Sequence, residues 1–103
     1  MAYDMTTRLH QIAAWYGDAL LERPAGPDRE ALGALLSSWQ AAADRATTDP
    51  SPAAGVAFVQ WARVLLILAE AERERGRTGW RPDWTPVYEE FVDGDDPVHG
   101  PLT

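Results

Sequence analysis

Apolar residues recur at helical spacing in three separate stretches of the chain, and proline, glycine or short polar residues bound each stretch. This periodicity predicts three helices, over about residues 4–23, 28–46 and 52–76. The first two apolar stripes consist of Met5, Leu9, Ile12, Ala13, Tyr16, Ala19 and Leu20, and of Leu32, Leu35, Leu36, Trp39, Ala43 and Ala46. We therefore expect an all-α fold.

Local signals mark where these helices begin and end. Asp4 and Asp28 are the predicted N-caps of the first two helices, because aspartate accepts hydrogen bonds from free N–H groups there. Ser51 followed by Pro52 is a favourable N-cap and first-turn pair for the third helix. Residues 23–27 contain two prolines and a glycine, so they separate the first helix from the second.

The third stretch is apolar around most of its circumference. Its polar residues Gln60, Arg63, Glu70 and Glu74 fall within about 80° of each other at helical spacing. A helix of this kind is packed on most sides, so we expect it at the centre of the fold, with its charged end, residues 70–75, projecting beyond the core. If the remaining chain cannot cover its apolar surface, a homodimer would bury the excess.

The C-terminal segment, residues 77–103, differs in character from the rest of the chain. Trp80 and Trp84 stand four residues apart, and nearby prolines prevent one continuous helix through them. Such an aromatic segment is either a lid over a small core or a surface for a partner. Beyond it, Thr85-Pro86 can start a short fourth helix.

Trp15 bears on the choice between lid and partner surface. It lies about 120° from Leu9 on the first helix, outside the apolar stripe and among charged neighbours. Trp15 is therefore either an exposed interface anchor or a ring that the returning C-terminal segment covers. We favour the lid, because a small domain needs the extra burial, at about 25 cal/mol per Å² of apolar area.

Together these patterns predict one helical domain over residues 1–103. Its architecture is a three-helix bundle with a long central third helix. The aromatic, proline-containing C-terminal segment, with its short fourth helix, packs on this bundle.

Composition narrows the possible functions. The net charge is −7, all basic residues are arginine, and cysteine is absent. Acidic proteins are poor ligands for phosphate backbones, so nucleic-acid binding is disfavoured. Without cysteine there are no disulfides and no thiolate metal sites.

The longest apolar run, residues 64–69, is far shorter than the roughly 20 residues that span a membrane. With no signal-peptide pattern at the start, we expect a cytoplasmic protein without a membrane segment.

No catalytic or cofactor pattern stands out. His10 and His99 belong to no known metal-binding motif, and no glycine-rich phosphate loop is present. The acidic stretch that includes Asp93, Asp95 and Asp96 lacks the length and distal glutamate of an EF-hand. We expect no metal, no cofactor and no enzymatic activity.

The favoured function is a small acidic protein-interaction module, such as an inhibitor, an immunity protein or an accessory protein. It would mask a partner surface that is basic. The residues expected to bind the partner are Arg8, Trp15, Trp80, Arg81, Asp83, Trp84, Glu89, Glu90, Asp93, Asp95 and Asp96.

The alternative is a nucleic-acid-associated regulator. A strip of arginines from Arg73 to Arg81 would contact phosphates, and Trp80 and Trp84 would stack on bases. Interleaved glutamates such as Glu72 dilute this strip.

The segment Trp80-Arg81-Pro82-Asp83-Trp84 resembles a W-x-P-D-W segment of uncharacterised phage-associated proteins. The resemblance covers five of the 103 residues. The family has no assigned chemistry, so the resemblance implies only an origin in a mobile element or a conflict system.

Overall fold

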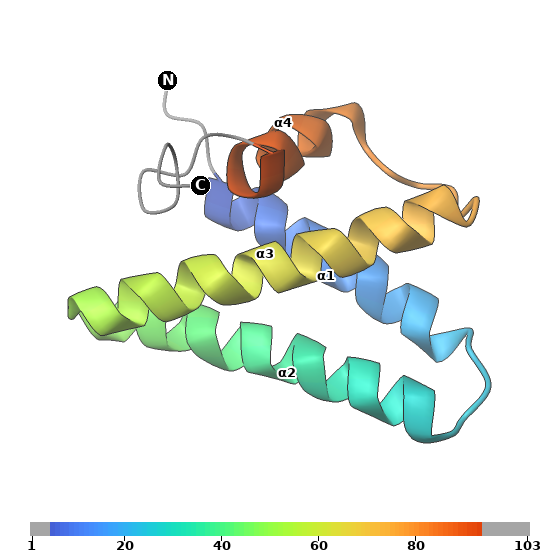
Figure 1. Ribbon diagram of the computed structural model, residues 1–103, viewed down its shortest axis with the longest axis horizontal. Coiled ribbons are helices and arrows are strands. Elements are labelled where there is room, and N and C mark those ends of the chain that lie inside the picture. Colours follow the sequence, from blue (N-terminus) through green and yellow to red (C-terminus); the bar gives the residue numbers. More distant parts are fainter. Residues whose placement is uncertain (1–4, 94–103) are drawn as a thin grey trace.

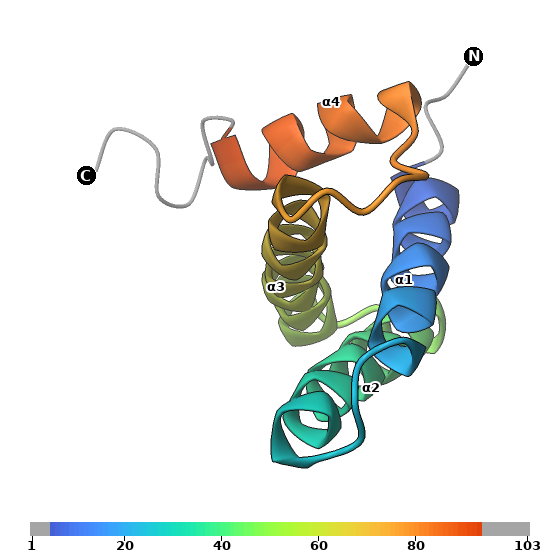
Figure 2. The same ribbon diagram turned by 90° about the vertical axis from the view of Figure 1, so that its right-hand side faces the viewer.

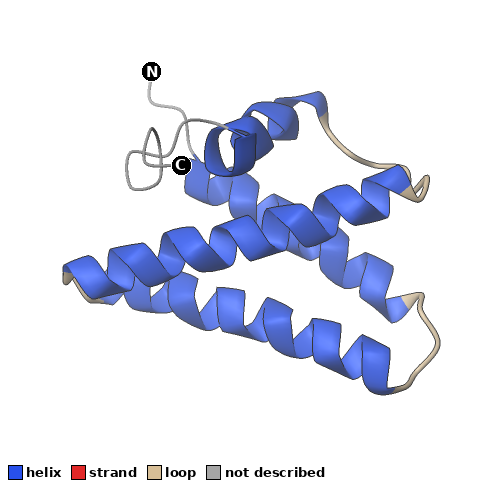
Figure 3. Ribbon diagram, in the orientation of Figure 1, coloured by secondary structure: helices blue, strands red, loops and turns tan. Residues whose placement is uncertain are grey.

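The computed structural model describes residues 5–93, and all regular elements in this range are helical (Figures 1 and 3). The three long helices are α1 (Met5–Leu21), α2 (Pro27–Thr48) and α3 (Pro52–Glu74). A short helical run follows, made of the 3-10 turn η1 (Pro82–Trp84), α4 (Thr85–Tyr88) and the π-helical turn η2 (Glu89–Asp93). The predicted all-α architecture, including the short fourth helix, is confirmed.

The helices surround α3 on three sides. In Figure 2, α1 lies beside α3, α2 packs below both, and the run from η1 to η2 lies across them above. The predicted packing of the C-terminal segment on the bundle is therefore confirmed for its described residues, 77–93. This arrangement brings residues of the segment against α1, which lies far from it in sequence.

The core draws on every long helix and on the C-terminal run. Its buried members are Leu9, Ile12, Ala13, Tyr16, Leu20, Trp39, Ala43, Ala62, Leu65, Leu66, Ala69, Trp84 and Val87. Trp39 is fully buried, and its ring packs near those of His10 and Phe58, with centroids 5.6 and 5.3 Å away. The stripe predicted for the first helix is buried, apart from Met5, which packs half-buried at the edge of the core.

One of the predicted helix starts is wrong. Helix α2 begins at Pro27 with Gly26 at the N-cap, so Asp28 lies inside the first turn. Proline is well suited to the first helical position, and a carboxylate in the first turn still interacts favourably with the helix dipole. The cap of α3 is confirmed, because Ser51 Oγ accepts a hydrogen bond from the Ala54 N–H at 3.3 Å. Asp4 lies outside the described residues.

Helix α3 ends at Glu74 in a glycine-terminated turn. Gly76 has a positive φ of 98°, a conformation that glycine adopts without the steric cost of a Cβ. The Gly76 N–H donates to the Arg73 carbonyl and the Arg77 N–H donates to the Glu72 carbonyl. These two bonds define a Schellman motif, which redirects the chain from α3 into the C-terminal segment.

Helix α3 is the predicted long central helix and has neighbours on three sides, but several of its apolar residues remain exposed. Its buried residues lie on one side, whereas Val56, Val59 and Ile67 are 54%, 40% and 52% exposed. The length and composition of α3 would allow it to cross a membrane, but the core helices of soluble proteins can have the same length and composition. In the most apolar 18-residue stretch of α3, 28% is buried inside the structure. Helices α1 and α2 and the C-terminal run therefore lie on three sides of α3, and the exposed residues lie on its fourth side.

Candidate functional site

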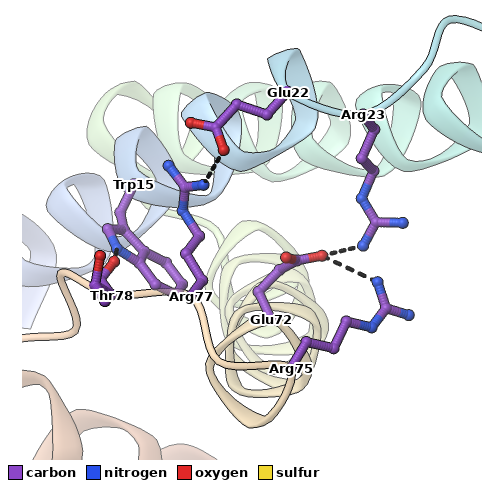
Figure 4. Close-up of polar contacts among 7 residues, drawn as sticks. All are labelled: Trp15, Glu22, Arg23, Glu72, Arg75, Arg77 and Thr78. Carbon is purple, nitrogen blue, oxygen red and sulfur yellow. Dashed lines mark hydrogen bonds and ion pairs between the residues drawn. The ribbon is translucent and has the colours of Figure 1, made fainter.

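Trp15 lies underneath the C-terminal segment. Its indole Nε1–H donates a hydrogen bond to the Thr78 carbonyl at 2.9 Å (Figure 4). Its ring meets those of Trp80 and Trp84 edge-on, with centroids 5.7 and 6.0 Å away, and the latter two are 5.5 Å apart. We call Trp15, Trp80 and Trp84 the tryptophan cluster. Of the two alternatives for Trp15, the structure therefore shows a ring that the returning C-terminal segment covers, and not an exposed residue that anchors an interface.

The polar edges of the tryptophan cluster are satisfied within the chain. Trp80 Nε1–H donates to Thr85 Oγ1 at 3.0 Å, and Trp84 Nε1–H donates to Gln11 Oε1 at 3.1 Å. Trp84 is only 3% exposed. Edge-to-face pairs of this kind add to the stability that burial alone supplies. The cluster therefore acts as a lid that fastens the segment to α1.

Gly79 allows the backbone of the C-terminal segment to pass close to the Trp15 indole. This role of Gly79 was not predicted from the sequence. Its φ is 101°, and a Cβ at this position would lie 2.7 Å from Trp15 Nε1. The backbone here passes directly over the indole edge, where no side chain fits. A glycine just before Trp80 was the available signal, but its meaning depends on Trp15, 64 positions earlier.

Two arginines cover the outside of the tryptophan cluster. The Arg73 guanidinium lies 5.3 Å from the Trp80 ring centroid, and that of Arg77 lies 5.6 Å from the ring of Trp15. Arg77 also forms an ion pair with Glu22 at 2.8 Å, and this hydrogen bond is the main cause that raises the pKa of Arg77 (Figure 4). Cation–π contacts of this kind stabilise the lid from the solvent side.

The charged end of α3 is anchored, which corrects the expectation that it projects beyond the core. Glu72 is 9% exposed and forms ion pairs with Arg23 and Arg75 (Figure 4). Arg23 comes from the loop after α1, so the pair joins two distant parts of the chain. A buried carboxylate needs such partners, because an unpaired charge is costly to desolvate. Burial is also the main cause that raises the pKa of the neighbouring Tyr16.

Three of the predicted partner-binding residues meet in one ion-pair group. Asp83 accepts hydrogen bonds from Arg8 Nε at 3.2 Å and from Arg81 Nε at 3.0 Å. The hydrogen bond from Arg81 is the main cause that lowers the pKa of Asp83. Partial burial raises this pKa, and the hydrogen bond from Arg8 lowers it further. This group ties the start of α1 to η1, so its residues have a structural role in addition to any role at the surface.

The stabilisation from Asp83 is expected to disappear in acid. The pKa of Asp83 is lower in the folded than in the unfolded chain, so its ionised carboxylate stabilises the fold at pH values above the ordinary pKa of aspartate. This stabilisation is lost as the pH falls through the pKa that Asp83 has in the folded chain. The difference in unfolding free energy between wild type and Asp83→Asn should therefore shrink below about pH 4. Urea denaturation at a series of pH values measures it. In an Arg81→Gln background the pH dependence should be weaker, and an unchanged dependence would contradict the assignment to this pair.

The remaining predicted residues are acidic and lie at the end of the described chain. Glu89 and Glu90 are exposed on η2, and neither forms an ion pair within the described residues. The side chain of Asp93, and all of Asp95 and Asp96, lie outside the described residues. The structure therefore brings the tryptophans together, groups Arg8, Arg81 and Asp83, and leaves two carboxylates facing solvent.

Within residues 5–93, no three histidine or carboxylate side chains are grouped so that they could hold a metal ion. No family model, curated protein or solved structure matches the chain. The described residues present charged side chains on a helical segment that buried Trp84 and Val87 hold to the core.

Proposed function

We propose that this protein is a small acidic interaction module that masks a basic surface of a partner protein, as an inhibitor, an immunity protein or an accessory protein. The observation that carries the proposal is the pair of exposed carboxylates, Glu89 and Glu90, on a segment that buried Trp84 and Val87 hold to the core. Carboxylates on a pre-ordered element lose little entropy on binding. The net charge of −7 would also accelerate encounter with a basic partner.

In this proposal the tryptophan cluster supports the site and does not touch the partner. The three indole N–H groups already donate within the chain, and Trp84 is buried. The charged side chains around the cluster remain accessible, with that of Arg81 56% exposed and that of Asp83 34%. The proposed contact surface therefore consists of Glu89 and Glu90, with Arg81 and Asp83 beside the lid.

The nucleic-acid alternative is less well supported, because its arginine strip is occupied. Each arginine in it has a carboxylate partner within the chain: Arg73 with Glu70, Arg75 with Glu72, Arg77 with Glu22 and Arg81 with Asp83. A phosphate would have to compete with these carboxylates, and a base would have to displace packed indole rings. A mobility-shift assay across salt concentrations tests this alternative, because phosphate contacts give a steep salt dependence.

The double variant Glu89→Gln/Glu90→Gln is expected to lose partner binding by about tenfold or more, because charge complementarity at an interface is removed while the fold is kept. The control Glu30→Gln/Asp44→Asn removes the same charge from exposed positions on α2, away from the C-terminal run. Wild type and both variants serve as baits in lysate of the source cells, and quantitative mass spectrometry compares the retained proteins.

Basic proteins should be retained by wild type and by the control and depleted on the double variant. Equal retention on all three baits would contradict the proposal. Retention that nuclease treatment abolishes would favour the nucleic-acid alternative instead.

A further inference from the structure

A short connection joins α3 to the helical run from η1 to η2, and we call residues 77–93 the C-terminal unit (Figure 2). Residues 78–80 form no backbone–backbone hydrogen bond with other described residues. Gly76 and Gly79, both with positive φ, lie beside and within this stretch. Hinges consist of a few loop or element-terminal residues that absorb large backbone rotations, so this connection has the construction of a hinge.

The three long helices have a core that is largely their own. Among the described residues of the buried core, only Trp84 and Val87 belong to the C-terminal unit. Trp39 of α2 is fully buried and packs instead near His10 of α1 and Phe58 of α3. Helices α1, α2 and α3 also contact one another pairwise. Most of the buried core therefore stays in place when the C-terminal unit is lifted from the bundle.

The polar contacts of the C-terminal unit reach α1 and the turn after it. These contacts are Trp84–Gln11, Asp83–Arg8, Thr78–Trp15 and Arg77–Glu22. They are hydrogen bonds and partly exposed ion pairs, and each contributes modestly to stability because water replaces it on opening. Since they are spread along one short unit, lifting the unit breaks them together.

We propose that the C-terminal unit opens cooperatively about the connection while α1, α2 and α3 remain folded. Opening withdraws Trp84 and Val87 from the core and leaves the rest of it buried, so it costs less free energy than complete unfolding. Glu89 and Glu90 lie on this unit. A partner that binds them in their closed position has an apparent affinity that falls with the closed fraction. That consequence rests on the function proposed above, whereas the opening itself does not.

Native-state amide hydrogen exchange of the full chain in low concentrations of urea tests the opening without any partner. The hydrogen-bonded amides of Trp84 and Glu89 report on the C-terminal unit, and those of Ile12 and Leu66 report on the bundle. The first pair should exchange through an opening of lower free energy and smaller urea dependence, because less surface becomes exposed. Equal free energies and urea dependences for the two pairs would overturn the proposal.

Trp39→Leu distinguishes two cooperative units from one. Its cavity lies between α2 and the other long helices, so it destabilises the closed and the open form equally. Exchange at Ile12 and Leu66 should accelerate roughly 100-fold, whereas exchange at Trp84 should not change. Equal acceleration at all three amides would show a single unit and contradict the proposal. Ala43→Gly, at a buried position of α2, is the milder variant if Trp39→Leu does not fold.

Gln11→Leu distinguishes opening of the whole unit from local fraying. Gln11 accepts the Trp84 indole hydrogen bond, and its loss destabilises only the closed form. Exchange at Trp84, Ile12 and Leu66 should therefore accelerate by the same factor, roughly tenfold. Gln40→Leu makes the same change at an exposed position of α2 and should alter none of these rates. An unchanged rate at Trp84 in Gln11→Leu would show fraying of a docked segment and overturn the proposal.

Discussion

Replacing Trp84 with alanine is expected to lower the free energy of unfolding by about 3–5 kcal/mol. Trp84 is 3% exposed, contacts the rings of Trp15 and Trp80, and donates to Gln11. The truncation leaves a cavity between α1 and the C-terminal run, and it removes the donor to the Gln11 side chain. Because Trp84 is the most buried member of the tryptophan cluster, its loss should release the lid as well as weaken the core.

Urea denaturation and amide hydrogen exchange measure the two effects separately. Exchange should accelerate most in residues 82–93, which the lid holds in place. Trp84→Phe is the matched control, because it keeps an aromatic ring and loses the hydrogen bond to Gln11, so it should cost about 1–3 kcal/mol. A loss below about 1 kcal/mol for Trp84→Ala would show that the segment is not part of the folded core.

Gly79→Ala is expected to destabilise the fold by about 2–4 kcal/mol, an unusually large effect for an exposed glycine. The positive φ of 101° strains any residue with a Cβ, and the new atom would lie 2.7 Å from Trp15 Nε1. Either the backbone or the indole must move, and the hydrogen bond from Trp15 to Thr78 then weakens. Thermal and urea unfolding of the variant measure the loss.

Gly76→Ala separates the two causes. Gly76 has a φ of 98°, but nothing lies within 4 Å of a Cβ placed there, so this variant should show only the backbone strain, about 1–2 kcal/mol. The excess at Gly79 then measures the close approach to Trp15. Equal losses at the two glycines would show that the backbone does not press against the indole.

The sequence alone determined the features of this protein that arise from neighbours within one or two helical turns. The stripe of α1 predicts its buried face because helical periodicity links positions three and four residues apart. The Ser51 cap and the pairs Glu70–Arg73 and Glu72–Arg75 follow from the same short range. The lid could also be anticipated, because a small core benefits from every apolar ring that covers it.

Only the tertiary structure decided the features that depend on residues far apart in the chain. Glu72 is buried because Arg23 reaches it from the loop after α1, and Gly79 is required because Trp15 lies beneath it. The full width of the open side of α3 could not be read from its sequence. The polar residues Gln60, Arg63, Glu70 and Glu74 mark the middle of that side, but Val56, Val59 and Ile67 are also exposed because few neighbours cover this helix. How many neighbours cover it depends on how the other helices pack, and helical periodicity within a single helix carries no information about that packing.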